Sequence, residues 1–174
     1  LCPVGAYQPA PGQSSCIDAD FGYHVPNEGS TGQIGCSMGS YQGQRGGTLC
    51  NPADPGYYVD SHFASSQTAC LAGTYNPSIG STSSNDCMDA NPGYFVENIG
   101  SGSQQACDYG YYQPNSGSSS CLMADPGHYV DTQAADAQIP CEAGTFNSDS
   151  GSTTGFACSD SDPGNYVPDP ASPA

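Results

Sequence analysis

Five short segments of the chain place an aromatic or imidazole side chain directly before a valine. They are His24 and Val25, Tyr58 and Val59, Phe95 and Val96, Tyr129 and Val130, and Tyr166 and Val167. Each follows a turn sequence of Asp or Asn, usually Pro, and then Gly, in which Pro fixes φ and Gly supplies a positive φ. Aromatic and β-branched residues beside a turn predict a short strand. No window has the 3.6-residue period of an amphipathic helix, so we expect almost no helix.

Ten cysteines follow the same period. They are Cys2, Cys16, Cys36, Cys50, Cys70, Cys87, Cys107, Cys121, Cys141 and Cys158. The steps between them alternate between a short step, as from Cys2 to Cys16, and a long step, as from Cys16 to Cys36. A fixed period of this kind is typical of a tandem array in which each unit contacts mainly its neighbours. We therefore predict five repeats, over residues 1–35, 36–69, 70–106, 107–140 and 141–174.

Each repeat keeps the same residue types at the same places. A Gly follows the first Cys by three residues, and an aromatic residue comes two positions later. We expect these aromatic residues to pack within the repeat: Tyr7, Tyr41, Tyr75, Tyr112 and Phe146. A second Gly follows, and the length variation lies between it and the second Cys, which indicates an exposed loop tip.

The composition offers few large aliphatic residues for a core, with 23 Gly, 15 Pro and no Trp among 174 residues. An even set of cysteines in such a chain favours a disulfide framework in an oxidising environment. Closing the short steps makes each repeat self-contained, and we favour this pairing. Closing the long steps leaves Cys2 and Cys158 for other chains. We predict a small disulfide-rich, mostly β and turn tandem-repeat rod with almost no helix.

Three segments carry a resemblance to a known family. CPVGAYQPAPGQSSC, CSMGSYQGQRGGTLC and CLAGTYNPSIGSTSSNDC resemble the CxxGxY modules of tumour-necrosis-factor-receptor-like and ephrin-receptor-like cysteine-rich repeats. The resemblance implies an extended rod of small modules, with the first two cysteines of each module paired and the Tyr packed over the bond. Residues 50–59 and 121–130 also resemble tandem repeats found in large secreted or surface proteins of microbes.

The charge of the chain excludes two classes of partner. Asp and Glu number 17 against a single basic residue, Arg45, which gives a formal net charge of −16. Nucleic acids and anionic membrane surfaces are both bound through clustered Lys and Arg, so we expect neither as a partner. No apolar run approaches the roughly 20 residues of a membrane-spanning helix, so we expect no membrane insertion in this segment.

No catalytic motif is present, and we predict that the protein is not an enzyme. Lys, HExxH and a Gly-rich phosphate loop are all absent from the sequence. The three histidines, His24, His62 and His128, lie in different repeats, and two of them occupy aromatic positions of the strand pattern, so we interpret them as substitutions. Zinc sites built from CxxC pairs do not fit the cysteine spacing, and disulfides use every thiol. We expect no metal and no cofactor.

Carboxylates beside two of the turns raise the question of calcium. Asp18 with Asp20, and Asp160 with Asp162, place two carboxylates two residues apart, and Ca²⁺ prefers oxygen ligands. In other repeats the first Asp of the pair is Pro52 or Met123. An Asp before Pro-Gly also caps its own turn. We therefore interpret these residues as turn residues and do not expect calcium binding.

Hydroxyl residues gather near the predicted loop tips. The glycosylation candidates are Ser14, Ser15, Ser81, Thr82, Ser83, Ser118, Ser119, Thr153 and Thr154. No Asn-x-Ser/Thr acceptor exists, since Asn76 is followed by Pro77. Tips rich in Ser and Thr are compatible with covalent O-glycans, and the alternative is that they are solvated turn residues.

The repeat phase nearly continues from one end of the chain to the other. Joining Ala174 to Leu1 of a second copy would separate Cys158 from the next Cys2 by almost the regular long step. An open head-to-tail contact builds a filament. Our hypothesis is a structural subunit of an extracellular fibre or cell-surface appendage that assembles head to tail with copies of itself. The alternative is a receptor-like or adhesin stalk that recognises a protein or a glycan, with the divergent segment around Arg45 as its surface.

Overall fold

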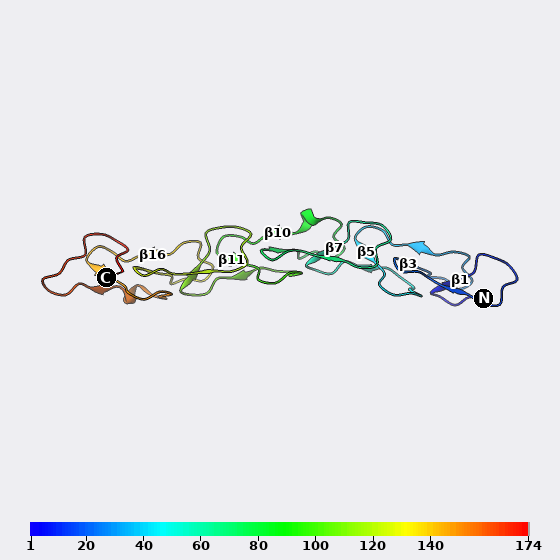
Figure 1. The fold of residues 1–174 in the computed structure, drawn as a ribbon, viewed down its shortest axis with the longest axis horizontal. Helices are drawn as coiled ribbons and strands as arrows, with labels where there is room; N and C mark the ends of the chain where they lie inside the picture. Colours follow the sequence, from blue (N-terminus) through cyan, green and yellow to red (C-terminus); the bar gives the residue numbers. More distant parts are fainter. Residues whose placement is uncertain (174) are drawn as a thin grey trace. The chain divides into compact units, whose positions relative to one another are not determined.

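The computed structural model describes residues 1–173, and Ala174, the residue that we expect at the head-to-tail join, lies outside them. Strands of two residues, joined by turns and loops, make up the regular structure (Figure 1). Within residues 1–173 there is no α-helix, and the only helical turns are two 3-10 turns, η1 (Ser84–Asp86) and η2 (Gly155–Ala157). The expectation of a disulfide-rich, mostly β and turn protein with almost no helix is confirmed.

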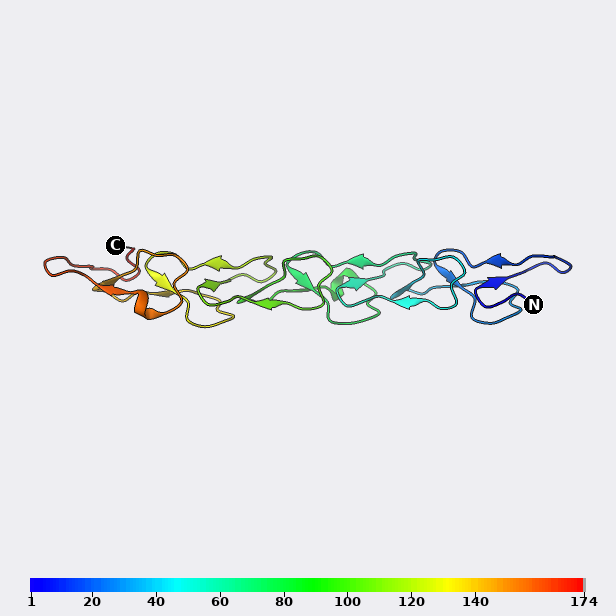
Figure 2. The same cartoon turned by 90° about the horizontal axis from the view of Figure 1, so that it is seen from below.

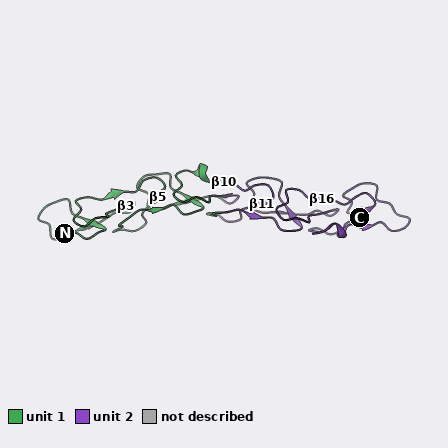
Figure 3. Ribbon diagram, turned by 180° about the vertical axis from the view of Figure 1, so that it is seen from behind, with its two compact units in different colours: residues 1–71, 76–88, 99–102 green, residues 72–75, 89–98, 103–174 purple. Residues whose placement is uncertain are grey.

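The chain divides into two compact units, coloured separately in Figure 3. Unit 1 contains residues 1–71, 76–88 and 99–102, and unit 2 contains residues 72–75, 89–98 and 103–174. Antiparallel hairpins in unit 1 pair β1 (Ala6–Tyr7) with β2 (Ile17–Asp18), β3 (Tyr23–His24) with β4 (Ile34–Gly35), β5 (Ser40–Tyr41) with β6 (Asn51–Pro52), and β7 (Tyr57–Tyr58) with β8 (Thr68–Ala69). Their order along unit 1 can be followed by colour in Figure 2.

Unit 2 is built from the same kind of hairpin. It pairs β11 (Tyr94–Phe95) with β12 (Gln105–Ala106), β13 (Tyr111–Tyr112) with β14 (Leu122–Met123), β15 (His128–Tyr129) with β16 (Ile139–Pro140), and β17 (Thr145–Phe146) with β18 (Ser159–Asp160). The remaining strands are β9 (Thr74–Tyr75) and β10 (Met88–Asp89). Residues 70–89 therefore contribute to both units.

Each of the first four sequence repeats contains two hairpins, and the fifth contains the hairpin of β17 and β18, so the hairpins recur at half of the cysteine period. The turn before β1 is closed by the Ala6 N–H donating to the Pro3 carbonyl, and the turn before β3 by the Tyr23 N–H donating to the Asp20 carbonyl. Gly5 and Gly22 hold the same position in these turns, with φ of +83° and +77°. The second turn was predicted from its pattern of Asp or Asn, usually Pro, and then Gly, whereas the CxxG segment forms the same turn without having been predicted to.

The two hairpins of a repeat are closed in different ways. The Cys-closed hairpins start at Cys2, Cys36, Cys70, Cys107 and Cys141, and disulfides join these residues to Cys16, Cys50, Cys87, Cys121 and Cys158. This is the self-contained pairing, with Cα atoms 5.7–5.8 Å apart. The Gln-closed hairpins start at Ala19, Ala53, Ala90 and Ala124, and a glutamine takes the place of the second cysteine.

A pair of hydrogen bonds closes a Gln-closed hairpin. Gln33 Oε1 accepts from the Asp20 N–H at 2.7 Å, and Gln33 Nε2 donates to Asp20 Oδ2 at 3.1 Å. Both bonds recur between Gln67 and Asp54 and between Gln138 and Asp125. Gln104 accepts from the Asn91 N–H in the same way. Hydrogen bonds thus replace the covalent link in every second hairpin.

The buried core consists of small side chains. The first residue of each hairpin is 0–7% exposed and alternates between Cys and Ala: Cys2, Ala19, Cys36, Ala53, Cys70, Ala90, Cys107, Ala124 and Cys141. The residue after the first strand alternates between a polar amide and a valine, and Val25, Val59, Val96 and Val130 are at most 2% exposed. Valine is the largest fully buried side chain, which agrees with the shortage of large aliphatic residues.

Backbone hydrogen bonds link consecutive hairpins within each unit. In unit 1 the Gly5 N–H donates to the Val25 carbonyl at 2.8 Å, and the Gly29 N–H donates to the Cys2 carbonyl at 2.8 Å. In unit 2 the corresponding bonds join Gly110 to Val130 and Ala134 to Cys107. The turn of one hairpin and the tip of the next are therefore tied together.

From the third hairpin on, the tip of each hairpin also packs on the turn of the hairpin two places earlier. A Cβ atom at Gly5 would overlap the Gly46 carbonyl, and its positive φ is a second reason for glycine there. The same tip-on-turn contact joins Phe63 to Gly22, Gly80 to Gly39 and Gly100 to Gly56 in unit 1, and Gly117 to Gly73, Ala134 to Gly93, Gly151 to Gly110 and Ala171 to Gly127 in unit 2.

Candidate functional site

The predicted packing aromatic residues lie at equivalent places in the Cys-closed hairpins. Tyr7, Tyr41, Tyr75, Tyr112 and Phe146 each end the first strand and are half-buried. Tyr7 faces Ile17 across its hairpin, and Tyr112 faces Leu122. Because both cross-strand partners are themselves exposed, these pairs leave apolar surface in contact with solvent.

Most of the glycosylation candidates are on the surface, with one exception. Ser14, Ser15, Thr82, Ser119, Thr153 and Thr154 are exposed, and Ser83 and Ser118 are half-buried. Ser81 is only 7% exposed, and its hydroxyl accepts a hydrogen bond from Asn76 Nδ2 at 2.8 Å. A glycan on Ser81 would disrupt this contact, so Ser81 was a wrong candidate. Sequence alone could not separate it from its exposed neighbours.

Of the four Asp residues considered as calcium ligands, three are exposed and the fourth, Asp20, contacts other side chains. Asp18 lies in β2 and Asp160 in β18, and both are exposed, as is Asp162. The carboxylate of Asp20 accepts a hydrogen bond from Gln33 and lies 3.7 Å from the Arg45 guanidinium. Asp20 therefore has a clear role in closing its hairpin.

An amide side chain in each Cys-closed hairpin, half-buried in the first and buried in the others, was not predicted. Gln42 Nε2 donates to the Leu49 carbonyl, and Gln42 Oε1 accepts from the Gln44 N–H. Gln8 and Gln113 make the same two bonds. In the two hairpins with the longer disulfide loop, the amide is instead Asn76 or Asn147, bonded to Ser81 or Ser152. The recurrence of Gln and Asn at this position was the available signal.

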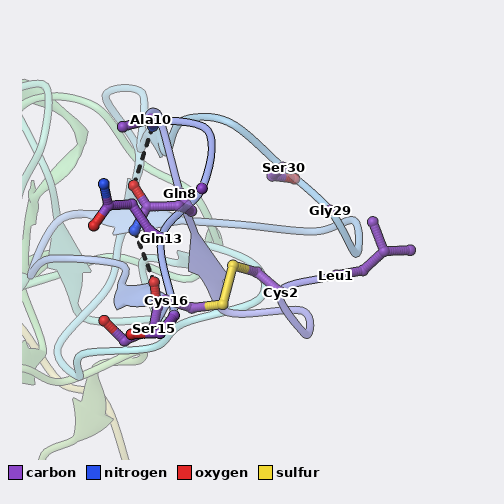
Figure 4. Close-up of a pocket in the computed structure, with 11 residues that line it drawn as sticks. Leu1, Cys2, Gln8, Ala10, Gln13, Ser15, Cys16, Gly29 and Ser30 are labelled. Atoms are coloured by element: carbon purple, nitrogen blue, oxygen red, sulfur yellow. Dashed lines mark hydrogen bonds between the residues drawn. A yellow bond between two sulfur atoms is a disulfide. The ribbon is translucent and has the colours of Figure 1, made fainter.

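Open hollows lie inside the loops of the Cys-closed hairpins. One of about 500 Å³ is lined by Gln8, Gln13, Ser14, Ser15 and the Cys2–Cys16 disulfide (Figure 4). A second, also about 500 Å³, is lined by residues at the equivalent positions around Gln42 and includes Arg45. Since a hollow recurs at equivalent loop positions although most of its lining side chains differ, we interpret it as a feature of the loop geometry.

One surface cluster departs from the repeat pattern. Phe21, at a position where the other repeats have Pro, is half exposed, and the Arg45 guanidinium lies 5.7 Å from its ring centroid. Phe63 stacks on Tyr23 with ring centroids 5.2 Å apart. Gly35 leaves room for this ring, because a Cβ there would overlap it. We call Phe21, Tyr23, Arg45 and Phe63 the aromatic–arginine patch.

A second departure from the repeat pattern lies next to the Cys36–Cys50 disulfide. Among the described His, Cys, Asp and Glu residues, one group of three brings its ligand atoms within 4.8 Å of one another: His24, Cys36 and Cys50. His24 Nδ1 lies 3.2 Å from Cys50 Sγ. His24 was interpreted as a substitution for an aromatic residue, and the linear spacing gave no sign of this contact.

Among the carboxylates of residues 1–173, the pKa of Asp108 is the one that is clearly shifted. The Tyr109 N–H and the Gln133 side chain both donate hydrogen bonds to Asp108 Oδ1, at 2.9 and 3.1 Å. These bonds stabilise the charged form, the backbone bond most strongly, and lower the pKa of Asp108. Asp108 is fully exposed, so we assign it a local structural role.

Comparison with known proteins leaves the chain without an assigned relative, since no family model and no curated protein matches it. No helix within residues 1–173 is long and apolar enough to span a bilayer. The five disulfides indicate an oxidising environment.

Proposed function

We propose that the protein is a structural subunit of an extracellular fibre or cell-surface appendage, in which copies associate head to tail. The observation that carries the proposal is the tip-on-turn contact. Gly144 and Gly164, the last two turn glycines, have no described atom within 4 Å of a Cβ position, whereas the equivalent interior glycines contact a hairpin tip. At the first two tips, Gly12 has no such neighbour and Gly29 meets only the Leu1 side chain.

Two uncovered tips and two uncovered turns match the offset of the interior contact. Because a tip packs on the turn two hairpins earlier, a following copy would place Gly12 on Gly144 and Gly29 on Gly164. This arrangement would reuse surfaces that already fit one another inside each unit. A contact of this kind does not close on itself and builds a filament.

An extracellular location agrees with the chemistry of the chain. Disulfides persist outside the cell, and ten paired cysteines would hold each repeat against unfolding there. The exposed Ser and Thr residues at the loop tips would carry O-glycans in such a fibre. The resemblance to CxxGxY modules of extracellular proteins points the same way.

Electron microscopy of the non-reduced protein tests the assembly, with a pair of glycine variants. Gly144→Ala/Gly164→Ala places a methyl group on each uncovered turn. Gly12→Ala is the matched control, because φ is also positive there and Ala134 and Ala171 show that a tip accepts Ala. We expect fibres from the wild type and from Gly12→Ala and isolated particles from the turn variant. Isolated particles from the wild type at every concentration would overturn the proposal.

The aromatic–arginine patch supports a second candidate function, that of a binding module. Exposed aromatic rings beside a cation suit the apolar faces and acidic groups of oligosaccharides. Binding to a panel of neutral and acidic glycans should then be lost in Phe21→Pro/Arg45→Ser. It should persist in Phe156→Ser, which removes a ring that is 96% exposed elsewhere. Equal binding by both variants would exclude the patch as the binding surface.

A further inference from the structure

An imidazole beside two sulfur atoms is a potential ligand set once the disulfide is opened. We propose that His24, Cys36 and Cys50 bind Zn²⁺ when the Cys36–Cys50 disulfide is reduced. This goes beyond the proposed fibre function and does not depend on it. The cysteines lack CxxC spacing, and no metal was expected from the sequence for that reason. The structure brings the three ligands together from two neighbouring hairpins, which linear spacing does not reveal.

The backbone holds the ligands in place independently of the disulfide. The Cys36 N–H donates to the Gly22 carbonyl, and the Cys36 carbonyl accepts from the Phe63 N–H, both at 2.8 Å. His24 lies in β3 and is paired with Ile34 of β4. Breaking the S–S bond leaves all of these contacts intact.

The distances suit a tetrahedral ion. Zn²⁺ binds thiolate at about 2.3 Å and imidazole nitrogen at about 2.0 Å, so its ligand atoms lie roughly 3.5 Å apart. His24 Nδ1 and Cys50 Sγ are already 3.2 Å apart. The two sulfur atoms must separate after reduction, which side-chain rotation allows across a Cα–Cα distance of 5.7 Å. Three protein ligands leave the fourth position for water, and the half-buried His24 and Cys50 give access from solvent.

Other disulfides in the chain lack this imidazole. The residues equivalent to His24 are Tyr58, Phe95 and Tyr129. Phe95 lines a hollow with Cys121, and Tyr129 lines one with Cys158, so these rings occupy the corresponding place next to a disulfide. The phenyl ring of Phe95 offers no ligand atom to a metal, and the phenols of Tyr58 and Tyr129 carry their oxygen at the para position, at the far end of the ring from the place of an imidazole Nδ1. The site is therefore specific to the Cys36–Cys50 pair.

The chemistry has two steps. A dithiol reductant supplies two electrons and two protons, the S–S bond of Cys36–Cys50 breaks, two thiols form, and the reductant becomes a disulfide. Zn²⁺ then displaces the two thiol protons and accepts a lone pair from neutral His24. Before oxidation the newly made chain already holds both thiols, so the same site exists in it without a reductant.

The experiment measures protection of thiols from alkylation in the full chain. The protein is reduced with a tertiary phosphine, which takes an oxygen atom from water to become the phosphine oxide while the two protons of that water go to the thiols. It is then treated with N-ethylmaleimide with and without Zn²⁺. Peptide mass spectrometry then gives the rate at each cysteine. Two variants are matched to each other: His24→Phe removes the imidazole, and Phe95→His places one beside Cys107–Cys121.

We expect Zn²⁺ to slow alkylation of Cys36 and Cys50 at least about tenfold relative to Cys107 and Cys121 in the wild type. His24→Phe should abolish the difference, and Phe95→His should extend the protection to Cys107 and Cys121. Added Co²⁺ should give a thiolate charge-transfer band that follows the same pattern. Equal alkylation rates at Cys36, Cys50, Cys107 and Cys121 in the wild type with Zn²⁺ would overturn the proposal, and so would this result if it arose because the reduced chain unfolds. Full protection of Cys36 and Cys50 in His24→Phe would overturn it as well.

Discussion

The Cys-closed and Gln-closed hairpins have the same fold and differ in how they are held shut. Both have the same turn with a positive-φ glycine, the same two-residue strand pairing and the same tip-on-turn contact. Cys107–Cys121 closes one hairpin covalently, and Gln138 closes the next through its bonds to Asp125. The turn and the contacts with neighbours therefore set the hairpin geometry, and the closing link adds stability to it.

Of all changes to the two kinds of hairpin, removing a disulfide should change the free energy of unfolding the most. Cys107→Ala/Cys121→Ala opens a loop of about 15 residues and should lower the free energy of unfolding by about 3 kcal/mol. Gln138→Ala, the matched change in the next hairpin, should lower it by about 1 kcal/mol. Urea denaturation with hydrogen exchange at the hairpin amides measures both, because repeat arrays open locally. Equal losses of unfolding free energy in the two variants would mean that a covalent link stabilises a hairpin no more than the glutamine hydrogen bonds do.

Converting a Gln-closed hairpin into a Cys-closed one should stabilise the protein. Ala124 and Gln138 have the same separation as Cys107 and Cys121, and Ala124 is fully buried like the cysteine it matches. Ala124→Cys/Gln138→Cys should form a sixth disulfide and raise the free energy of unfolding by about 2 kcal/mol after the lost Gln bonds are counted. Thiol titration of the folded protein checks it. Two free thiols would show that the hairpins are not equivalent.

The reverse conversion should recover part of a lost disulfide. Asp108 follows Cys107 as Asp125 follows Ala124, so Cys107→Ala/Cys121→Gln supplies every group of a Gln-closed hairpin. This variant should be about 1 kcal/mol more stable than Cys107→Ala/Cys121→Ala. The same denaturation measurement compares the two. No difference between them would show that the glutamine link requires more than its two partners.

The smallest expected effect on stability comes from the ionisation of Asp108, because its carboxylate is exposed. Its pKa is lowered in the folded chain, first by the Tyr109 N–H and then by Gln133. Its contribution to stability is therefore present above the unfolded pKa, about 3.9, and is lost as the pH falls through the lower folded pKa. Gln133→Ala should raise the pKa of Asp108 toward its ordinary value, as measured by NMR titration of the carboxyl carbon. An unchanged pKa would assign the whole shift to the backbone.

The parts of the fold with a chemical marker could be predicted from the sequence. Cysteines gave the repeat and Asp-Pro-Gly gave the turns, whereas the half-length period was hidden because Ala replaces Cys and Val replaces Gln or Asn in the second hairpin. Gln33, Gln67, Gln104 and Gln138 recur in phase, so their link to the turn was visible in principle. The contact of His24 with Cys50 was not, because it joins two hairpins through space.

The tip-on-turn contact also bears on how the chain reaches its native state. The turn at Gly5 contacts the tip at Gly46, two hairpins later, and the Gly29 N–H donates to the Cys2 carbonyl of the preceding hairpin. All contacts of a hairpin with later residues can therefore form once the two hairpins after it have been synthesised. Because no tip-on-turn contact reaches beyond the second hairpin along the chain, the array suits assembly from the N-terminus while the chain emerges. Each pair of cysteine thiols can be oxidised to its disulfide in turn, so that few unpaired thiols are present at one time. Duplicating a repeat would lengthen such a chain without creating a harder folding problem.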